Sequence, residues 1–167
     1  MRISRSFAAS ALIAGLIGLG AALAGPAGAA SASPGDHRIG DYDGRTFATA
    51  TTANNLVTMR APSSGANQVW KFTQDSYGTY RMINRLTGGC LAVRPYSSGQ
   101  NPEVVQRPCN GNPNERWQLV RTSSVHVAFR NVGAQGRCLT VNRYFSPARL
   151  FANPCNIGST IQQFRLL

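Results

Sequence analysis

One short pattern recurs three times in this chain at a constant spacing. The stretches QVWKF, ERWQL and QQFRL contain Trp70, Trp117 and Phe164, and successive members are 47 residues apart. In each stretch another large apolar residue follows two places later, across a polar one, which is the alternation of a half-buried strand. A period of this length indicates one supersecondary unit used three times, with each large residue facing a shared core.

Two further landmarks recur in the same order and support the same division. A first landmark reads TFAT, CLAV and CLTV, beginning at Thr46, Cys90 and Cys138. The second landmark reads RAPSS, RPCNG and NPCNI, and the first copy has no cysteine there. Three landmarks in one order, three times, predict three repeats of about 47 residues.

The repeats also choose between the possible disulfides. Four cysteines allow three pairings, so the count alone leaves the choice open. If the second and third copies fold alike, each closes its own bond: Cys90 with Cys109 and Cys138 with Cys155. Each cross-link would add about 3 kcal/mol to the stability by the loop-entropy estimate. The rival interpretation, a metal site, has neither a CxxC spacing nor a nearby histidine to support it.

Short strand-like runs fill the space between the landmarks. They are TYRMIN at 79–84, EVVQR at 103–107, VHVAFRN at 125–131 and RLFAN at 149–153. Turn-rich loops separate them, and no window after residue 30 has helical apolar spacing. About four short strands per repeat predict an all-β chain, with three units packed around a pseudo-threefold axis.

The first thirty residues have the features of a secretory signal. Arg2 and Arg5 precede an apolar run from Phe7 to about Leu23, and the small residues that follow suit cleavage after Ala30 or Ala32. We therefore expect a signal peptide at 1–30, a short tail at 31–35 and one domain at 36–167. An uncleaved membrane span is the alternative, although the run is a little short for one.

The mature chain is basic without a basic cluster. The formal charge is +11 at pH 7, and losing Arg2 and Arg5 with the leader lowers it by two, because all six acidic residues come later. The arginines are scattered, which fits either general solubility or attraction to an acidic extracellular polymer. No recognition motif favours nucleic acid.

These residues resemble the ricin B-type lectin family of β-trefoil carbohydrate-binding domains. The resemblance is carried by the Q-x-W tripeptide, the C-L-x-V strand and a second cysteine about eight residues before the tryptophan, and it covers 36–167. It implies a β-trefoil. It also implies that the residues of the Q-x-W positions are structural: Gln68, Trp70, Glu115, Trp117, Gln162 and Phe164.

The sugar pocket of that family is not retained in any repeat. The resemblance implies an Asp after the C-L pair, and this chain has Ala48, Ala92 and Thr140 there. It implies an aromatic two residues before the second cysteine, where this chain has Arg60, Arg107 and Asn153. The remaining pocket residue, an Asn before the Q-x-W glutamine, is present as Asn67 and Asn114 and replaced by Ile161.

Other side chains could form a substitute site. Tyr96 and Tyr144 each lie six places after the first cysteine of their repeats, and a tyrosine combines an apolar face with a polar tip. Arg107 beside Asn114 could offer a forked donor to a carboxylate or phosphate. The candidate glycan-binding residues are therefore Asn67, Tyr96, Arg107, Asn114, Tyr144 and Asn153; the alternative is that the tyrosines pack on their own turns and the arginines are solvated.

Catalysis finds little support in the sequence. His37 and His126 have no partner pattern, and Asp36, Asp41 and Asp43 are interpreted as turn residues. With the cysteines paired, no nucleophile has a plausible base. We predict a protein that is not an enzyme and uses no cofactor and no metal.

Two functions from different classes remain open. The first is a secreted lectin-like protein that binds an extracellular glycan or cell-wall polysaccharide through a non-standard site, acidic glycans being one option. The second is a protein-binding trefoil, such as a protease inhibitor or a partner of a surface or toxin protein; decay of the sites is a third option. We expect a monomer.

Overall fold

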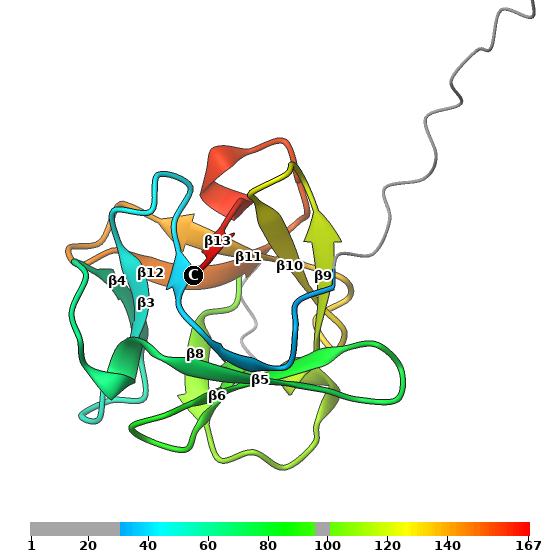
Figure 1. Ribbon diagram of the computed structural model, residues 1–167, viewed down its shortest axis with the longest axis horizontal. Coiled ribbons are helices and arrows are strands. Elements are labelled where there is room, and N and C mark those ends of the chain that lie inside the picture. The colour runs from blue at the N-terminus through cyan, green and yellow to red at the C-terminus, as the bar shows by residue number, and fades with distance from the viewer. Residues whose placement is uncertain (1–30, 96–100) are drawn as a thin grey trace, which may run out of the picture.

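Short antiparallel strands follow one another in the same order three times. The computed structural model describes residues 31–95 and 101–167, and Figure 1 shows its strands. The strands are β1 (Gly35–His37), β2 (Ile39–Gly40), β3 (Phe47–Ala50), β4 (Val57–Arg60), β5 (Trp70–Gln74), β6 (Tyr80–Asn84), β7 (Cys90–Val93), β8 (Val104–Arg107), β9 (Trp117–Arg121), β10 (Val127–Asn131), β11 (Cys138–Asn142), β12 (Arg149–Asn153) and β13 (Arg165–Leu166). Each strand predicted from the sequence is present.

Three single-turn 3-10 helices were not expected from the sequence. They are η1 (Ala66–Gln68), η2 (Pro113–Glu115) and η3 (Thr160–Gln162), and each ends at the first residue of the stretch QVWKF, ERWQL or QQFRL. A turn of three residues is too short to leave a helical apolar pattern, so the periodicity could not show it. None of the helices in the two described ranges is long and apolar enough to cross a membrane.

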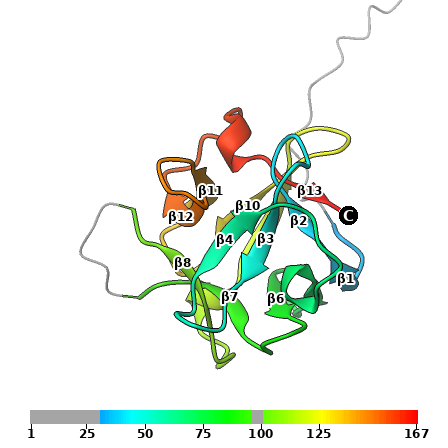
Figure 2. The ribbon, with the colours of Figure 1, turned by 90° about the vertical axis from the view of Figure 1, so that its left-hand side faces the viewer.

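Strand pairing relates the three repeats by a pseudo-threefold axis. The last strand of each repeat pairs with the first strand of another: β5 with β6, β9 with β10, and β13 with β2. Within each repeat the two middle strands form a hairpin, β3–β4, β7–β8 or β11–β12. Figure 2 shows the three hairpins on the face of the molecule that is turned toward the viewer. This arrangement is the β-trefoil expected from the repeats.

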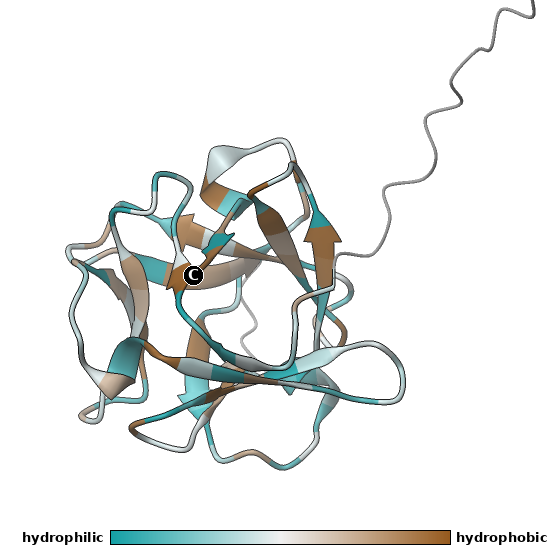
Figure 3. Ribbon diagram, in the orientation of Figure 1, coloured by the Kyte–Doolittle hydropathy of each residue, from teal (hydrophilic) through white to brown (hydrophobic). Residues whose placement is uncertain are grey.

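The core includes the large residues that set the 47-residue spacing. Trp70, Trp117 and Phe164 are fully buried. Phe129 contacts Phe72 and Phe164 edge to face, with ring centroids 6.2 and 5.6 Å apart. Figure 3 shows hydrophobic colouring along the strands and mostly pale or hydrophilic colouring in the loops. The period-two alternation therefore places one face of β5, β6 and β9 in the core, whereas β3 and β7 are buried along their whole length.

Both predicted disulfides are confirmed. Cys90 bonds Cys109 across 19 positions, and Cys138 bonds Cys155 across 17. In repeat 1 the corresponding places hold Phe47 and Pro62, because Phe47 pairs with Arg60 as Cys90 pairs with Arg107. The sequence alignment had placed Thr46 opposite Cys90, which is wrong by one residue.

The shift in repeat 1 changes which residue stands for the family's Asp. Trp70 Nε1 donates to the Ala48 carbonyl at 2.9 Å, as Trp117 Nε1 donates to the Leu91 carbonyl at 2.9 Å. Ala48 therefore corresponds to Leu91, and Thr49 rather than Ala48 occupies the Asp position. Comparison of the repeat sequences missed this shift because the small residues on both sides of Phe47 fit either alignment. The pairing of β3 with β4 allows only one register.

The segment predicted as an N-terminal tail contacts the domain. The Ala32 N–H donates to Tyr80 Oη at 3.2 Å, and Tyr80 Oη donates to the Ala32 carbonyl at 3.0 Å. Strand β1 then pairs with β5, with His37 opposite Trp70. Residues 31–37 thus pack along the strands of repeat 1 and its neighbour.

Candidate functional site

A cleft of about 720 Å³ lies on repeat 2. Its walls come from the end of β7, the end of β8, the loop that carries η2, and the turn between β10 and β11. Three arginines line it, Arg94, Arg107 and Arg137, together with Asn114 and Glu115. This volume is in the usual range for a small-molecule site.

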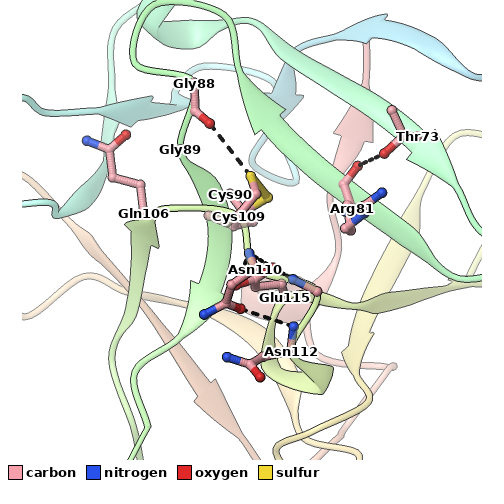
Figure 4. The surroundings of a disulfide bond; sticks show 12 residues. Thr73, Arg81, Gly88, Gly89, Cys90, Gln106, Cys109, Asn110, Asn112 and Glu115 are labelled. Atoms are coloured by element: carbon pink, nitrogen blue, oxygen red, sulfur yellow. Dashed lines mark hydrogen bonds between the residues drawn. A yellow bond between two sulfur atoms is a disulfide. The ribbon is translucent and has the colours of Figure 1, made fainter.

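The floor of the cleft is held by backbone hydrogen bonds. Glu115 is only 2% exposed, and its carboxylate accepts the N–H groups of Asn110 at 3.1 Å and Gly111 at 3.0 Å. Figure 4 shows Glu115 facing the loop of Asn110 and Asn112. Because these donors take up the carboxylate, Glu115 orders the loop rather than reaching into solvent.

Asn114 presents one unused polar atom. Its Nδ2 donates to the Val93 carbonyl at 2.8 Å, which fixes the amide. Its Oδ1 is buried and has no hydrogen-bond partner. A buried acceptor of this kind costs about 1–3 kcal/mol when nothing donates to it.

The opposite wall of the cleft requires a glycine. Gly133 donates its N–H to the Pro113 carbonyl at 3.0 Å. A Cβ at Gly133 would lie 2.5 Å from the Asn114 nitrogen and 2.7 Å from the Pro113 carbonyl carbon, so no larger residue fits without moving the backbone. The turn of repeat 3 is thereby held against the site of repeat 2.

Positive charge dominates the lining residues. Arg94 pairs with Glu103 at 3.0 Å, and Glu103 also contacts Arg149 at 3.3 Å. Arg107 is exposed and has no carboxylate partner within residues 31–95 and 101–167. Its planar guanidinium can therefore offer paired donors to an external carboxylate or phosphate.

The structure brings together two of the candidate residues. Arg107 and Asn114 line the same cleft, as their proposed pairing requires. Asn67, Asn153 and Tyr144 belong to the other repeats and do not line it. Tyr144 is 98% exposed, with its backbone N–H bonded to Asn142 Oδ1 at 3.0 Å. Tyr96 lies outside the described residues.

Sequence reasoning missed the contribution of the next repeat. Arg137 and Gly133 both come from the β10–β11 turn, about 45 residues from the first strand of the cleft. No local motif marks them. Only the packing of repeat 3 against repeat 2 places them beside Arg107.

The Q-x-W glutamines face the protein interior. Gln68 Nε2 donates to Thr49 Oγ1 at 3.0 Å and to the Ala61 carbonyl at 2.8 Å, and its Oε1 accepts the Ser63 N–H at 2.8 Å. Gln162 makes the matching bonds to Thr140 Oγ1 and the Pro154 carbonyl. The residues at the family's Asp position are Thr49, Ala92 and Thr140, all buried, so no repeat offers a carboxylate there.

Both histidines and two of the three N-terminal acids, Asp36 and Asp41, have structural partners. His126 contacts the Tyr42 carbonyl through Nε2 at 3.0 Å and Ser123 Oγ through Nδ1 at 3.0 Å. Asp41 accepts the Thr46 hydroxyl at 2.8 Å. Asp36 accepts a hydrogen bond from Arg85 at 2.7 Å, which raises the pKa of Arg85. In the described part of the chain, no group of three metal-ligating side chains gathers.

Comparison with solved structures gives the same fold. A designed threefold-symmetric protein, ThreeFoil, aligns with a TM-score of 0.70 and 22% identity over 79% of this chain and 97% of its own. A Polyporus squamosus lectin aligns with a TM-score of 0.70 and 14% identity over 82% of this chain and 50% of its own. The exo-β-1,3-galactanase 1,3Gal43A of Clostridium thermocellum aligns with a TM-score of 0.71 and 14% identity over 80% of this chain and 30% of its own.

The chain thus spans half or less of the last two relatives, and at these identities the likeness concerns the fold alone. No curated protein matches the sequence. A family model described as ricin-type beta-trefoil lectin domain-like matches residues 66–149, half of the chain. That match, with the three repeats and the trefoil pairing, shows that the chain belongs to the ricin-type β-trefoil lectin-like family.

Proposed function

We propose that this chain is a secreted, non-enzymatic carbohydrate-binding module that holds an anionic glycan in the cleft of repeat 2. The observation that carries the proposal is the joint presence of Arg107 and Asn114 on one cleft. The buried amide oxygen of Asn114 lacks a donor, and a small shift of the side chain toward the cleft would let a sugar hydroxyl supply one. The guanidinium of Arg107 can pair with a carboxylate or a phosphate.

The charge of the cleft favours an acidic sugar over a neutral one. Among the described lining residues, Arg107 has no carboxylate partner, Arg94 pairs with Glu103, and the carboxylate of Glu115 is occupied by backbone N–H groups. The Polyporus squamosus lectin, half of which aligns with this chain, was solved bound to Neu5Acα2-6Galβ1-4GlcNAc, a glycan with an acidic sugar. Among the described residues that line this cleft there is no aromatic side chain, so ionic pairing is the contact that those residues support.

Export is part of the proposal. The apolar leader with a small-residue cleavage motif predicts secretion, and two disulfides suit an oxidising compartment. An extracellular location would bring the module to wall or matrix polysaccharides. We expect it to act as a monomer.

A glycan array tests the proposal. The oxidised mature protein is applied to neutral, carboxylated and phosphorylated glycans at low and high salt, beside the variants Arg107→Ala and Asn114→Ala. We expect retention on anionic glycans that survives moderate salt and falls in both variants. Arg121→Ala is the control, because it removes the same charge from a cleft beside the C-terminus. If no glycan is retained, or if the control falls equally, the proposal is wrong.

A protein partner is the second candidate. Tyr144 and Tyr77 are 98% and 81% exposed, and exposed tyrosines are common anchors of protein interfaces. A pull-down from culture fluid with the wild type and with Tyr144→Ala would test this candidate. A protein captured only by the wild type would support it, whereas recovery of polysaccharide alone would not.

A further inference from the structure

A second cleft of about 780 Å³ lies beside the first. It is formed by the β3–β4 turn of repeat 1, the β6–β7 turn, and the end of β8. The residues that matter here are Asn55, Leu86, Thr87, Gln106, Arg107 and Cys109. Of the three residues at the family's pocket positions in repeat 2, Ala92, Arg107 and Asn114, only Arg107 lines this second cleft.

The floor of the second cleft is rigid and partly apolar. Gln106 is buried; its Oε1 accepts the Thr87 hydroxyl at 2.5 Å, and its Nε2 donates to the Thr51 carbonyl. Leu86 is 58% exposed at the edge, next to the disulfide. A fixed polar floor with an apolar side suits a sugar ring, which has hydroxyls on its rim and C–H groups on its faces.

Arg107 belongs to both clefts. It lines the cleft of repeat 2 with Asn114 and Glu115, and it lines the second cleft with Gln106 and Cys109. Figure 4 shows the disulfide between these two groups, with Gly88 and Gln106 on one side and Asn110, Asn112 and Glu115 on the other. The two clefts are therefore adjacent, and an exposed arginine stands at their junction.

We propose that the two clefts form one extended site for an internal stretch of an anionic polysaccharide. Arg107 pairs with an acidic group at the junction, and the sugar residues on either side of it lie in the two clefts. This inference rests on the proposed function and adds to it the length and polymeric nature of the ligand. Each cleft alone already has the volume of a small-ligand site, so a single ring leaves one of them empty.

The length of the ligand provides the test. Binding of galacturonate oligomers with one, two, three and six residues is measured by titration calorimetry, and glycerol phosphate oligomers form a parallel series. We expect the affinity to rise by about tenfold or more between one and three residues, as a second filled cleft adds contacts. The series with the gain identifies carboxylate or phosphate as the paired group.

Three variants separate the parts of the site. Leu86→Glu places a repelling carboxylate in the second cleft, so the gain with length should vanish while single-residue binding stays. Arg107→Ala should weaken binding at every length. Arg121→Ala, the charge-matched control, should leave the whole series unchanged. Leu86 is more than half exposed, so its replacement should not disturb folding.

The outcomes that overturn the inference differ from those that overturn the proposed function. Equal affinity for one and six residues would mean a one-ring site, and the proposed function would stand. A gain with length that Leu86→Glu leaves intact, or that Arg121→Ala reduces equally, would mean diffuse charge attraction and no extended site. Absence of binding by every oligomer and every array glycan would overturn both.

Discussion

Repeat 2 differs from repeats 1 and 3 at the residue that ends its 3-10 turn. Repeats 1 and 3 have Gln68 and Gln162, whose Nε2 groups donate to the hydroxyls of Thr49 and Thr140 at 3.0 Å. Repeat 2 has Glu115 in that place, and the threonine is replaced by Ala92. A carboxylate has no hydrogen to donate, so the two changes fit each other.

The difference teaches where the fold tolerates a change of chemistry. Glu115 replaces the lost bonds by accepting backbone N–H groups from Asn110 and Gly111, which makes a tight loop beside the cleft. The two glutamines each accept one backbone N–H, from Ser63 or Asn156. The same backbone position thus supports either an amide network or an anion-capped loop, and the arginine-lined cleft occurs with the latter.

Removal of a disulfide should have the largest effect, and it compares repeat 2 with repeat 3. Cys90→Ala/Cys109→Ala and Cys138→Ala/Cys155→Ala each open a loop of similar length, so each should lower the free energy of unfolding by about 3 kcal/mol. Only the first pair lies between the two clefts, so only its loss should also weaken glycan binding. Urea denaturation and calorimetry provide the two measurements.

A matching loss of binding in the repeat 3 variant would contradict this assignment. It would mean that the affinity follows global stability rather than the local position of the Cys90–Cys109 bond. Retained binding in both variants would show that the disulfide does not order the clefts.

Restoring the amide network in repeat 2 should have a smaller effect. Ala92→Thr and Glu115→Gln together would recreate the bond seen between Gln162 and Thr140, whereas each change alone supplies one partner without the other. We expect a coupling free energy of about 1 kcal/mol in favour of the double variant. Urea denaturation of the four proteins gives this value; zero or unfavourable coupling would show that the two substitutions are independent.

Acid should have the smallest effect, through the hairpin turn that enters repeat 2. Partial burial acts to raise the pKa of Asp75, but hydrogen bonds from the Thr79 hydroxyl, the Thr79 and Tyr77 N–H groups, and nearby Arg116 hold it below its ordinary value of 3.8. Because the pKa of Asp75 is lower in the folded protein than in the unfolded chain, the ionised carboxylate stabilises the fold at pH values above 3.8. This contribution is lost as the pH falls below 3.8.

Asp75→Asn therefore tests the acid-sensitive turn. At neutral pH the free energy of unfolding of the wild type should exceed that of the variant by less than about 1 kcal/mol, because the Asp75–Arg116 ion pair is partly exposed. This difference should shrink at strongly acidic pH. Ser123→Ala is the comparison in the matching turn before repeat 3, where a neutral hydroxyl bonds His126. Thermal unfolding across acidic pH measures both, and a difference that grows in acid would refute the sign.

Much of the fold could be predicted because it depends on local, repeated patterns. The spacing of Trp70, Trp117 and Phe164 and the strict alternation around them predict inward-facing strands in three copies. Repetition also selects the disulfides. The error in repeat 1 arose where this signal is weakest, since Thr46, Ala48 and Thr49 are all small and only the pairing of β3 with β4 distinguishes them.

The site could be predicted only in part. Arg107 and Asn114 both stand at pocket positions that the family resemblance implies for repeat 2, and they line one cleft. The sequence did not indicate that Arg137 and Gly133 of repeat 3 complete that cleft. Nor did it show that Asn55 of repeat 1 shares a second cleft with Arg107.

The sequence by itself determined an all-β chain of three repeats, with one disulfide within repeat 2 and one within repeat 3. It could do so because apolar spacing and repetition are properties of short stretches. Only the tertiary structure decided which side chains share a surface. The clefts are built where turns of one repeat meet strands of another, and those contacts depend on non-local strand pairing around the threefold axis. Neighbours of that kind are far apart in sequence, so no local pattern encodes them.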